Sequence, residues 1–182
     1  MAIVASDLPW KRSTTSGSAG NTTTQSNPQG CLGKYISTTA VPTAIHSLFL
    51  QMAGSDNAAL VAQYACVFIH NAHASLTLYG AKAYLSGGDP AGGATVAIAA
   101  DTTAASPVGS SSAQALTAAS PTAPGATITG LAFSAPSSAT SGISLGDIPP
   151  GYCKAIWVRR TGTNSTAATE AITLAVAGGT LA

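Results

Sequence analysis

The stretch that decides the fold runs from Gly146 to Thr161 and reads GDIPPGYCKAIWVRRT. Its Pro-Pro-Gly corner fixes the backbone for a tight turn, and apolar and aromatic residues follow the turn. Side chains alternate between two faces along a strand, so the neighbouring Arg159 and Arg160 point to opposite sides. The pattern predicts a strand over residues 152–161 and indicates a structural rather than a catalytic segment.

Alternation with a period of two continues through much of the chain after Leu32. The predicted strands cover residues 32–37, 45–52, 63–71, 75–86, 95–100, 127–134, 152–161 and 171–177. A short helix is predicted over 57–63, capped by Asp56. These elements predict an all-β protein that forms a single antiparallel β-sandwich of jelly-roll-like or immunoglobulin-like type.

The predicted strand over 63–71 is apolar on both faces. Each face must then be covered, either by the opposing sheet or by another subunit. Residues 101–125 consist mostly of Ala, Ser, Thr and Pro, which predicts a long surface excursion with an edge strand near 114–117. A second excursion is predicted over 134–141. Such segments serve either as contact surfaces or as tolerated spacers.

The first 30 residues show no periodicity and are rich in Ser, Thr, Asn and Gly. They predict an extended N-terminal arm at 1–30, followed by a β-sandwich domain at 31–182. Within the arm, Leu8, Trp10, Lys11 and Arg12 form an aromatic and basic group suited to binding a partner. The alternative is a frayed terminus.

The composition points to a subunit of an assembly. Only 7% of the 182 residues are charged, 46% are hydrophobic, and the formal net charge is +1. A surface with so little charge favours association, so we expect a homo-oligomer, with a trimer favoured. The near-neutral balance argues against a nucleic-acid partner. No apolar run approaches the ~18 residues of a membrane span, and no signal peptide is evident at Met1, so we expect cytoplasmic synthesis.

No arrangement of residues predicts catalysis. The six carboxylates fall mostly at turns or strand ends, and no nucleophile elbow, phosphate-binding loop or CxxC pair is present. His70 and His73, with His46 or a carboxylate as a third ligand, could converge on a metal, but a hydrogen-bonded turn or an interface role is favoured over a metal site. We therefore predict no enzyme, no catalytic residues, no metal and no cofactor.

Three cysteines, Cys31, Cys66 and Cys153, cannot all pair, so free thiols are expected in a reducing compartment. Cys66 and Cys153 lie inside apolar strands and are predicted to be buried. Trp157 is expected in the core rather than on a sugar-binding surface. Asp147 and Arg160 could form an ion pair, which would add little stability if exposed.

Three stretches resemble accessory structural proteins of tailed-bacteriophage particles: LGKYIS from Leu32, YACVFIHN from Tyr64, and the ribbon around Trp157. The resemblance covers residues 32–181. It implies a β-sandwich module displayed on a capsid or tail, with an interaction role and no catalytic residues. The expected location is the virion, with assembly in the host cytoplasm.

Within that class, the short chain and its arm favour a capsid decoration or cement protein that binds the outer capsid surface through the N-terminal arm. Its partners would be the major capsid protein or other virion proteins. The alternative is a tail, neck or head-fibre component involved in host-surface attachment, with binding of a host glycan.

Overall fold

The computed structural model describes residues 2–44, 46–87, 93–165 and 171–180. Its strands are β1 (Trp10–Thr14), β2 (Tyr35–Ala40), β3 (Ala62–His70), β4 (Leu78–Gly87), β5 (Ala94–Ala100), β6 (Ser106–Pro107), β7 (Ile143–Ile148), β8 (Tyr152–Gly162) and β9 (Thr173–Gly179). Four short helical turns join them: η1 (Ala5–Asp7), η2 (Pro28–Gly30), α1 (Gly54–Ala58) and α2 (Ala126–Thr129). The protein is all-β, as the sequence predicts.

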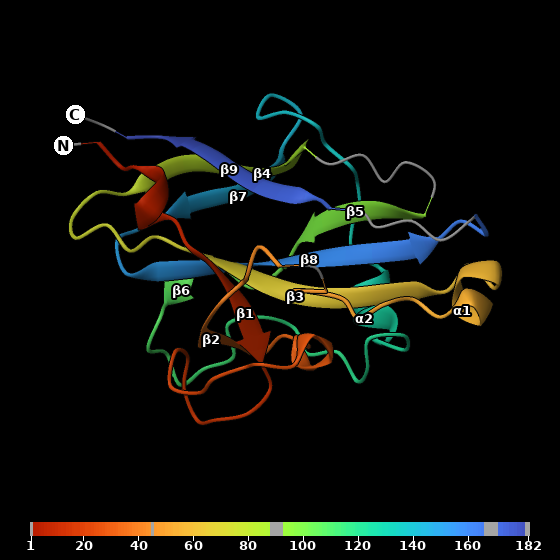
Figure 1. Ribbon diagram of the computed structural model, residues 1–182. Coiled ribbons are helices and arrows are strands. Elements are labelled where there is room, and N and C mark those ends of the chain that lie inside the picture. Colours follow the sequence, from red (N-terminus) through yellow and green to blue (C-terminus); the bar gives the residue numbers. More distant parts are fainter. Residues whose placement is uncertain (1, 45, 88–92, 166–170, 181–182) are drawn as a thin grey trace.

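The strands form two antiparallel sheets that lie one above the other (Figure 1). The larger sheet has the order β2-β1-β3-β8-β5, with β6 pairing to β8, and the smaller sheet has the order β7-β4-β9. Two opposed antiparallel sheets make a β-sandwich, so the coarse prediction of the fold is confirmed.

Strand β8 is the ribbon that the sequence singles out, and it lies inside the larger sheet. It pairs with β3 from Ala62↔Thr161 to His70↔Cys153 and with β5 on its other side. The Pro-Pro-Gly corner forms the predicted turn from β7 into β8: the Tyr152 amide donates to the Pro149 carbonyl at 3.1 Å, and Gly151 has a φ of +75°. That backbone angle favours glycine.

One apolar core fills the space between the two sheets. The larger sheet contributes alternate residues of β3, β5 and β8, and the smaller sheet contributes residues of β4 and β7. Its buried members include Val67, Ile69, Ile98, Ile156, Leu78 and Ile148. Burial of each such side chain contributes about 1.5–3 kcal/mol.

A second core lies on the opposite face of the larger sheet. Cys66, Phe68 and Trp157 point to this side, where Ala115 and Ile128 cover them. The covering residues belong to the long connection between β5 and β7, which forms a third layer below the sheet in Figure 1. The chain therefore covers both apolar faces of β3 itself. The predicted excursion over 101–125 does lie at the surface, and Thr117 forms a β-bridge with Gly33 near the predicted edge strand, but it is not a separate loop because its apolar residues pack on the sheet as a layer of the fold.

Two buried polar side chains hold the covering layer in place. Asp101 accepts hydrogen bonds from the amides of Thr103 and Leu116 and from the indole of Trp157. Gln114 accepts from the Ile36 amide and donates to backbone carbonyls of the same layer. Buried polar groups are stable only when paired, so these bonds allow a segment of small residues to lie against the sheet.

The predicted N-terminal arm is also wrong as a separate extended unit. Strand β1 lies between β2 and β3 and pairs with both. The Ser/Thr-rich segment after β1 is tied down as well: the Thr38 amide donates to the Thr23 carbonyl, and the Gly20 amide donates to the Ser110 carbonyl. The predicted domain boundary at residue 30 therefore falls within a single sheet, because strands on both sides of it pair with each other.

Two predicted strands are absent where the structure describes them. Residues 46–52 are irregular, because the side chains of Arg12 and Arg160, rather than a neighbouring strand, donate to the carbonyls of Ser47 and Leu50. Residues 127–134 contain the helical turn α2, which buries Ile128. Helix α1 (Gly54–Ala58) overlaps the predicted 57–63 helix by only two residues, and its N-cap is Ala53 rather than Asp56, which lies in the first turn. Strand β7 was not predicted.

Candidate interaction surface

Strand β9 forms one edge of the smaller sheet and is open on its outer side. Within the described residues, its backbone is hydrogen-bonded only to β4. Its sequence, TLAVAGG, carries no charge and no proline. Natural edge strands are usually protected by lysine, proline, bulges or a covering segment, because an open edge can pair with another chain. Strand β9 is therefore suited to pairing with a strand of another chain.

The other sheet protects its edges. The β2 edge is covered, since the Lys34 amide donates to the Leu116 carbonyl and the Asn21 amide donates to the Ile36 carbonyl. The β5 edge is covered at Ile98, which exchanges two backbone hydrogen bonds with Ser134. The smaller sheet differs, because among the described residues neither β9 nor its opposite edge β7 has a backbone partner beyond β4.

An apolar groove of about 280 Å³ lies beside β9. It is lined by Leu174, Ala175 and Val176 on one side and by Ala5, Leu8 and Trp10 on the other. Helix η1 and the carboxyl end of β9 lie at the same end of the molecule (Figure 1). Two of the four residues that the sequence assigns to partner binding, Leu8 and Trp10, thus line a groove next to an open edge.

Lys11 and Arg12, the other two assigned residues, serve the fold. The guanidinium of Arg12 is buried and donates to the carbonyls of Gln25, Ser26 and Ser47, which joins two loops to β1. Lys11 donates from Nζ to the side chain of Asn21 at 2.8 Å, and burial lowers the pKa of its ammonium. Arg12 is therefore not available to a partner.

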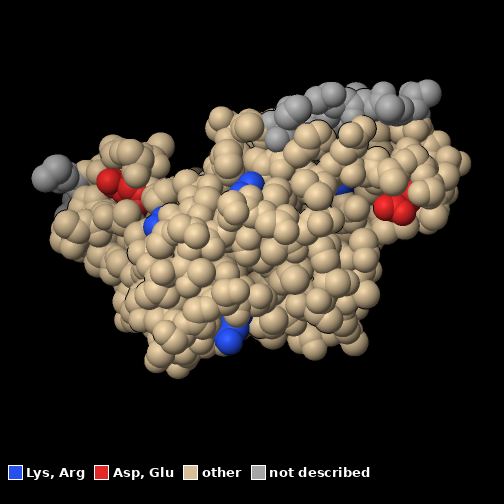
Figure 2. Space-filling model, turned by 60° about the horizontal axis from the view of Figure 1, so that its bottom comes forward, with Lys and Arg blue, Asp and Glu red and all other residues tan. Residues whose placement is uncertain are grey.

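Charged side chains are sparse and scattered over the face of the molecule that Figure 2 shows. Lys and Arg form no cluster there, in keeping with a net charge of +1. A nucleic-acid interface needs grouped cations to neutralise phosphates, so this face does not offer one.

The two neighbouring histidines have different roles in the fold. Nδ1 of His73 accepts hydrogen bonds from the amides of Ser75 and Leu76 at 3.1 and 3.0 Å, which shows the turn role that the sequence favours. His70 is half-buried, and desolvation, followed by the nearby charge of Lys11, lowers its pKa. Over the described ranges, no group of three or more metal-ligating side chains comes together.

The remaining titratable groups of the interior are structural. Burial raises the pKa of the Cys31 thiol to about 11 and that of Cys153 to about 12, and both cysteines are free. Nζ of Lys154 donates to the backbone carbonyls of Asp101 and Thr103, and burial lowers its pKa.

Asp147 and Arg160 do not pair in the way that the sequence suggests. Oδ1 of Asp147 accepts from the Gly80 amide at 2.8 Å, whereas Arg160 donates to the Leu50 carbonyl and to the side chain of Gln63. Trp157 is fully buried, as predicted.

Among the described residues, no helix has the length and apolar character needed to cross a membrane. No family model matches the chain, and the comparisons with curated proteins and with solved structures also give no match.

Proposed function

We propose that the protein is a non-enzymatic structural component of a phage particle, a decoration or cement module on the outer capsid surface. The observation that carries the proposal is the uncharged, open β9 edge beside the groove of Leu8 and Trp10. This combination suits stable association with another protein through backbone pairing and apolar contact. We assign attachment to the capsid to the groove, in place of a free N-terminal arm, and pairing between copies to the edge.

The same edge supports self-association. Because the chain covers both faces of β3 itself, an oligomer must form through other surfaces. Pairing of β9 with β9 of a second copy would give a two-fold dimer, whereas pairing of β9 with β7, the opposite edge of the same sheet, would give a head-to-tail ring. We favour the ring, closed as a trimer, which suits the local three-fold axes of an icosahedral shell. The jelly-roll-like or immunoglobulin-like type of sandwich stays a prediction.

Quantitative mass spectrometry of purified virions tests the assignment. We expect about one copy for each copy of the major capsid protein. Virions carrying Trp10→Ala should lose most of the protein, because aromatic residues in interface pockets often contribute about 2 kcal/mol or more. Trp10 also packs against the core, so the melting temperature of the variant serves as the control for folding. A dozen copies or fewer would instead place the protein in the tail or neck, and absence from virions would refute the proposal.

A further inference from the structure

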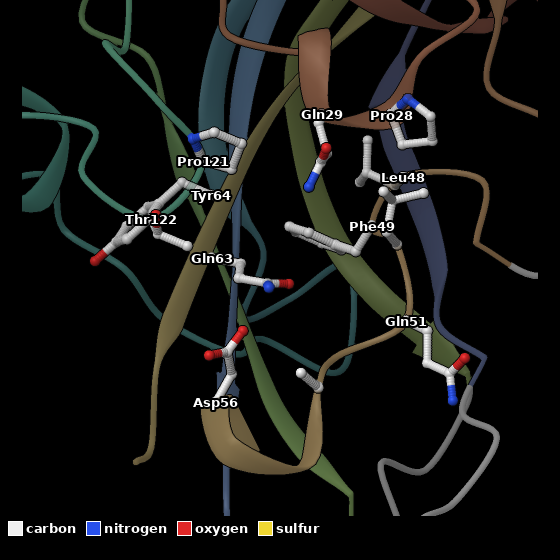
Figure 3. A pocket seen from close by; sticks show the side chains of 12 residues that line it. Pro28, Gln29, Leu48, Phe49, Gln51, Asp56, Gln63, Tyr64, Pro121 and Thr122 are labelled. Carbon is white, nitrogen blue, oxygen red and sulfur yellow. The ribbon is translucent and has the colours of Figure 1, made fainter. Parts of the chain in front are cut away.

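A second hollow, of about 210 Å³, lies far from β9 in sequence and has a different chemical character. Four separate parts of the chain line it: η2, residues 48–56, the first residues of β3, and residues 121–122. Figure 3 shows Gln29, Asp56 and Gln63 around the ring of Phe49, with Tyr64 on the left, across the β3 ribbon. The lining thus combines an aromatic surface with amide and carboxylate groups.

Arg160 positions two of these side chains. Its guanidinium lies 4.9 Å from the centre of the Phe49 ring, and it donates to Oε1 of Gln63 and to the Leu50 carbonyl. A cation over a ring and a charge-assisted hydrogen bond both restrict side-chain rotation. Phe49 and Gln63 are therefore held in place before any ligand arrives, which lowers the entropic cost of binding.

Two polar side chains in the lining have unused hydrogen-bonding groups. Within the described part of the chain, the carboxylate of Asp56 and the amide of Gln29 have no hydrogen-bond partner. Figure 3 shows the Gln29 amide and the Asp56 carboxylate pointing toward the space beside Phe49 from opposite sides. Together they offer two amide donors, an amide acceptor and a charged acceptor that can bind two adjacent hydroxyls.

We propose that this hollow binds a single neutral sugar unit, either free or at the end of a glycan. Sugar hydroxyls both donate and accept hydrogen bonds, which matches the mixed set on Gln29, Asp56 and Gln63, and the apolar face of a sugar ring can lie against Phe49. The hollow is smaller than the ~300–1,000 Å³ typical of sites for drug-sized ligands, so it fits one ring.

The charges select against other ligands. Asp56 disfavours anionic sugars, and Arg160 is already engaged by Phe49, Gln63 and the Leu50 carbonyl. A purely apolar ligand would leave the carboxylate and the amides without partners, which is costly. This inference concerns a different surface from the capsid-binding one, so either proposal can fail alone.

Saturation-transfer NMR on the full chain tests the site, with the methyl glycosides of glucose, galactose, mannose and N-acetylglucosamine as probes. We expect at least one neutral glycoside to bind with a dissociation constant on the order of 1 mM. Asp56→Asn removes the charged acceptor at constant size and should weaken that binding about tenfold or more. Phe49→Leu keeps an apolar side chain without the ring and should also abolish saturation transfer.

Asp147→Asn is the matched control, because it makes the same chemical change on exposed β7 and should leave glycoside binding unchanged. Melting temperatures of all variants show whether a loss of binding reflects unfolding. Two results would overturn the proposal: none of the four neutral glycosides binds, or Asp56→Asn and Asp147→Asn bind them equally well.

Discussion

The indole Nε1–H of Trp157 donates a 2.7 Å hydrogen bond to Oδ2 of Asp101 in the interior, where the covering layer meets the larger sheet. The same oxygen accepts from the Leu116 amide at 2.9 Å, and Oδ1 accepts from the Thr103 amide at 2.7 Å. One carboxylate therefore joins β8, the end of β5 and the covering layer. The bonds explain how an alanine- and serine-rich segment can lie stably against an apolar sheet.

We expect Asp101→Asn to lower the free energy of unfolding by about 2–4 kcal/mol. The amide has one acceptor oxygen for one buried and two partly buried donors, and each buried donor left unsatisfied costs about 1–3 kcal/mol. Urea unfolding followed by tryptophan fluorescence measures the loss. Asp147→Asn is the control: its carboxylate is exposed and accepts from Gly80, so the change should cost less than about 1 kcal/mol. Equal midpoints for the two variants would contradict this role of Asp101.

The N-terminal strand should be necessary for folding. Deleting residues 1–14 removes β1 from between β2 and β3, so we expect cooperative unfolding to be lost. Arg12→Met tests the same point with less disruption: it keeps an apolar stem but leaves the carbonyls of Gln25, Ser26 and Ser47 without their donor. We expect Arg12→Met to lower the free energy of unfolding by about 2–4 kcal/mol.

Lys11→Met is the matched control for Arg12→Met, because Lys11 makes one partly buried hydrogen bond to Asn21. It should cost no more than about 1 kcal/mol in chemical denaturation. A deletion variant that still unfolds cooperatively at the wild-type midpoint would show that residues 1–14 are an appendage after all.

Stability should fall in alkali because of the buried thiols. The pKa of Cys153 is raised from 9.0 to about 12, so above about pH 9 the unfolded chain releases this proton while the folded protein keeps it. The free energy of unfolding then decreases by up to about 1.4 kcal/mol for each pH unit. Lys154 changes stability in the opposite direction, since its pKa is lowered. Lys154 is present in both wild type and Cys153→Ala, so the difference between their pH dependences of stability isolates the effect of the thiol.

Urea titrations between about pH 8 and pH 10.5 in the presence of a reductant measure this difference. Cys153→Ala should show the shallower decline, because it lacks one thiol that titrates mainly in the unfolded chain. Identical slopes for the two proteins would mean that Cys153 is not buried as described.

Chelators and zinc should leave the melting temperature unchanged. Nδ1 of His73 is already occupied by two backbone amides, which leaves His70 without a second ligand beside it. Thermal unfolding with EDTA and then with added zinc tests this expectation. Stabilisation by zinc that disappears in His70→Ala would contradict the turn role of this pair.

The sequence correctly predicts the strands in which apolar and polar residues alternate strongly. The prediction fails for segments that are held in place by polar contacts instead. The apolar ribbons that became β3 and β8 lie within two residues of their predicted bounds and pair with each other. Strand β1 could not be found this way, because Arg12 is buried by bonds to carbonyls from loops that follow far along the chain. Such bonds have no local signature.

The candidate surfaces were only partly predictable for the same reason. Leu8 and Trp10 stand out by residue type, but the groove requires β9, which is more than 160 residues away along the chain. The hollow around Phe49 draws Gln29, Asp56 and Gln63 from separate segments, so no motif marks it. Whether a strand lies at an open edge depends on sheet order, which alternation does not specify.

The most direct test of assembly through β9 is the molar mass in solution, measured by size-exclusion chromatography with light scattering at about 10–50 µM. We expect the wild-type protein to have three times the 17.8 kDa subunit mass. Ala175→Lys places a charge in the β9 groove and should give a monomer, whereas the matched change Ala113→Lys, at an exposed site on the covering layer, should leave the trimer intact. A wild-type monomer, or equal masses for the two lysine variants, would contradict assembly through this edge.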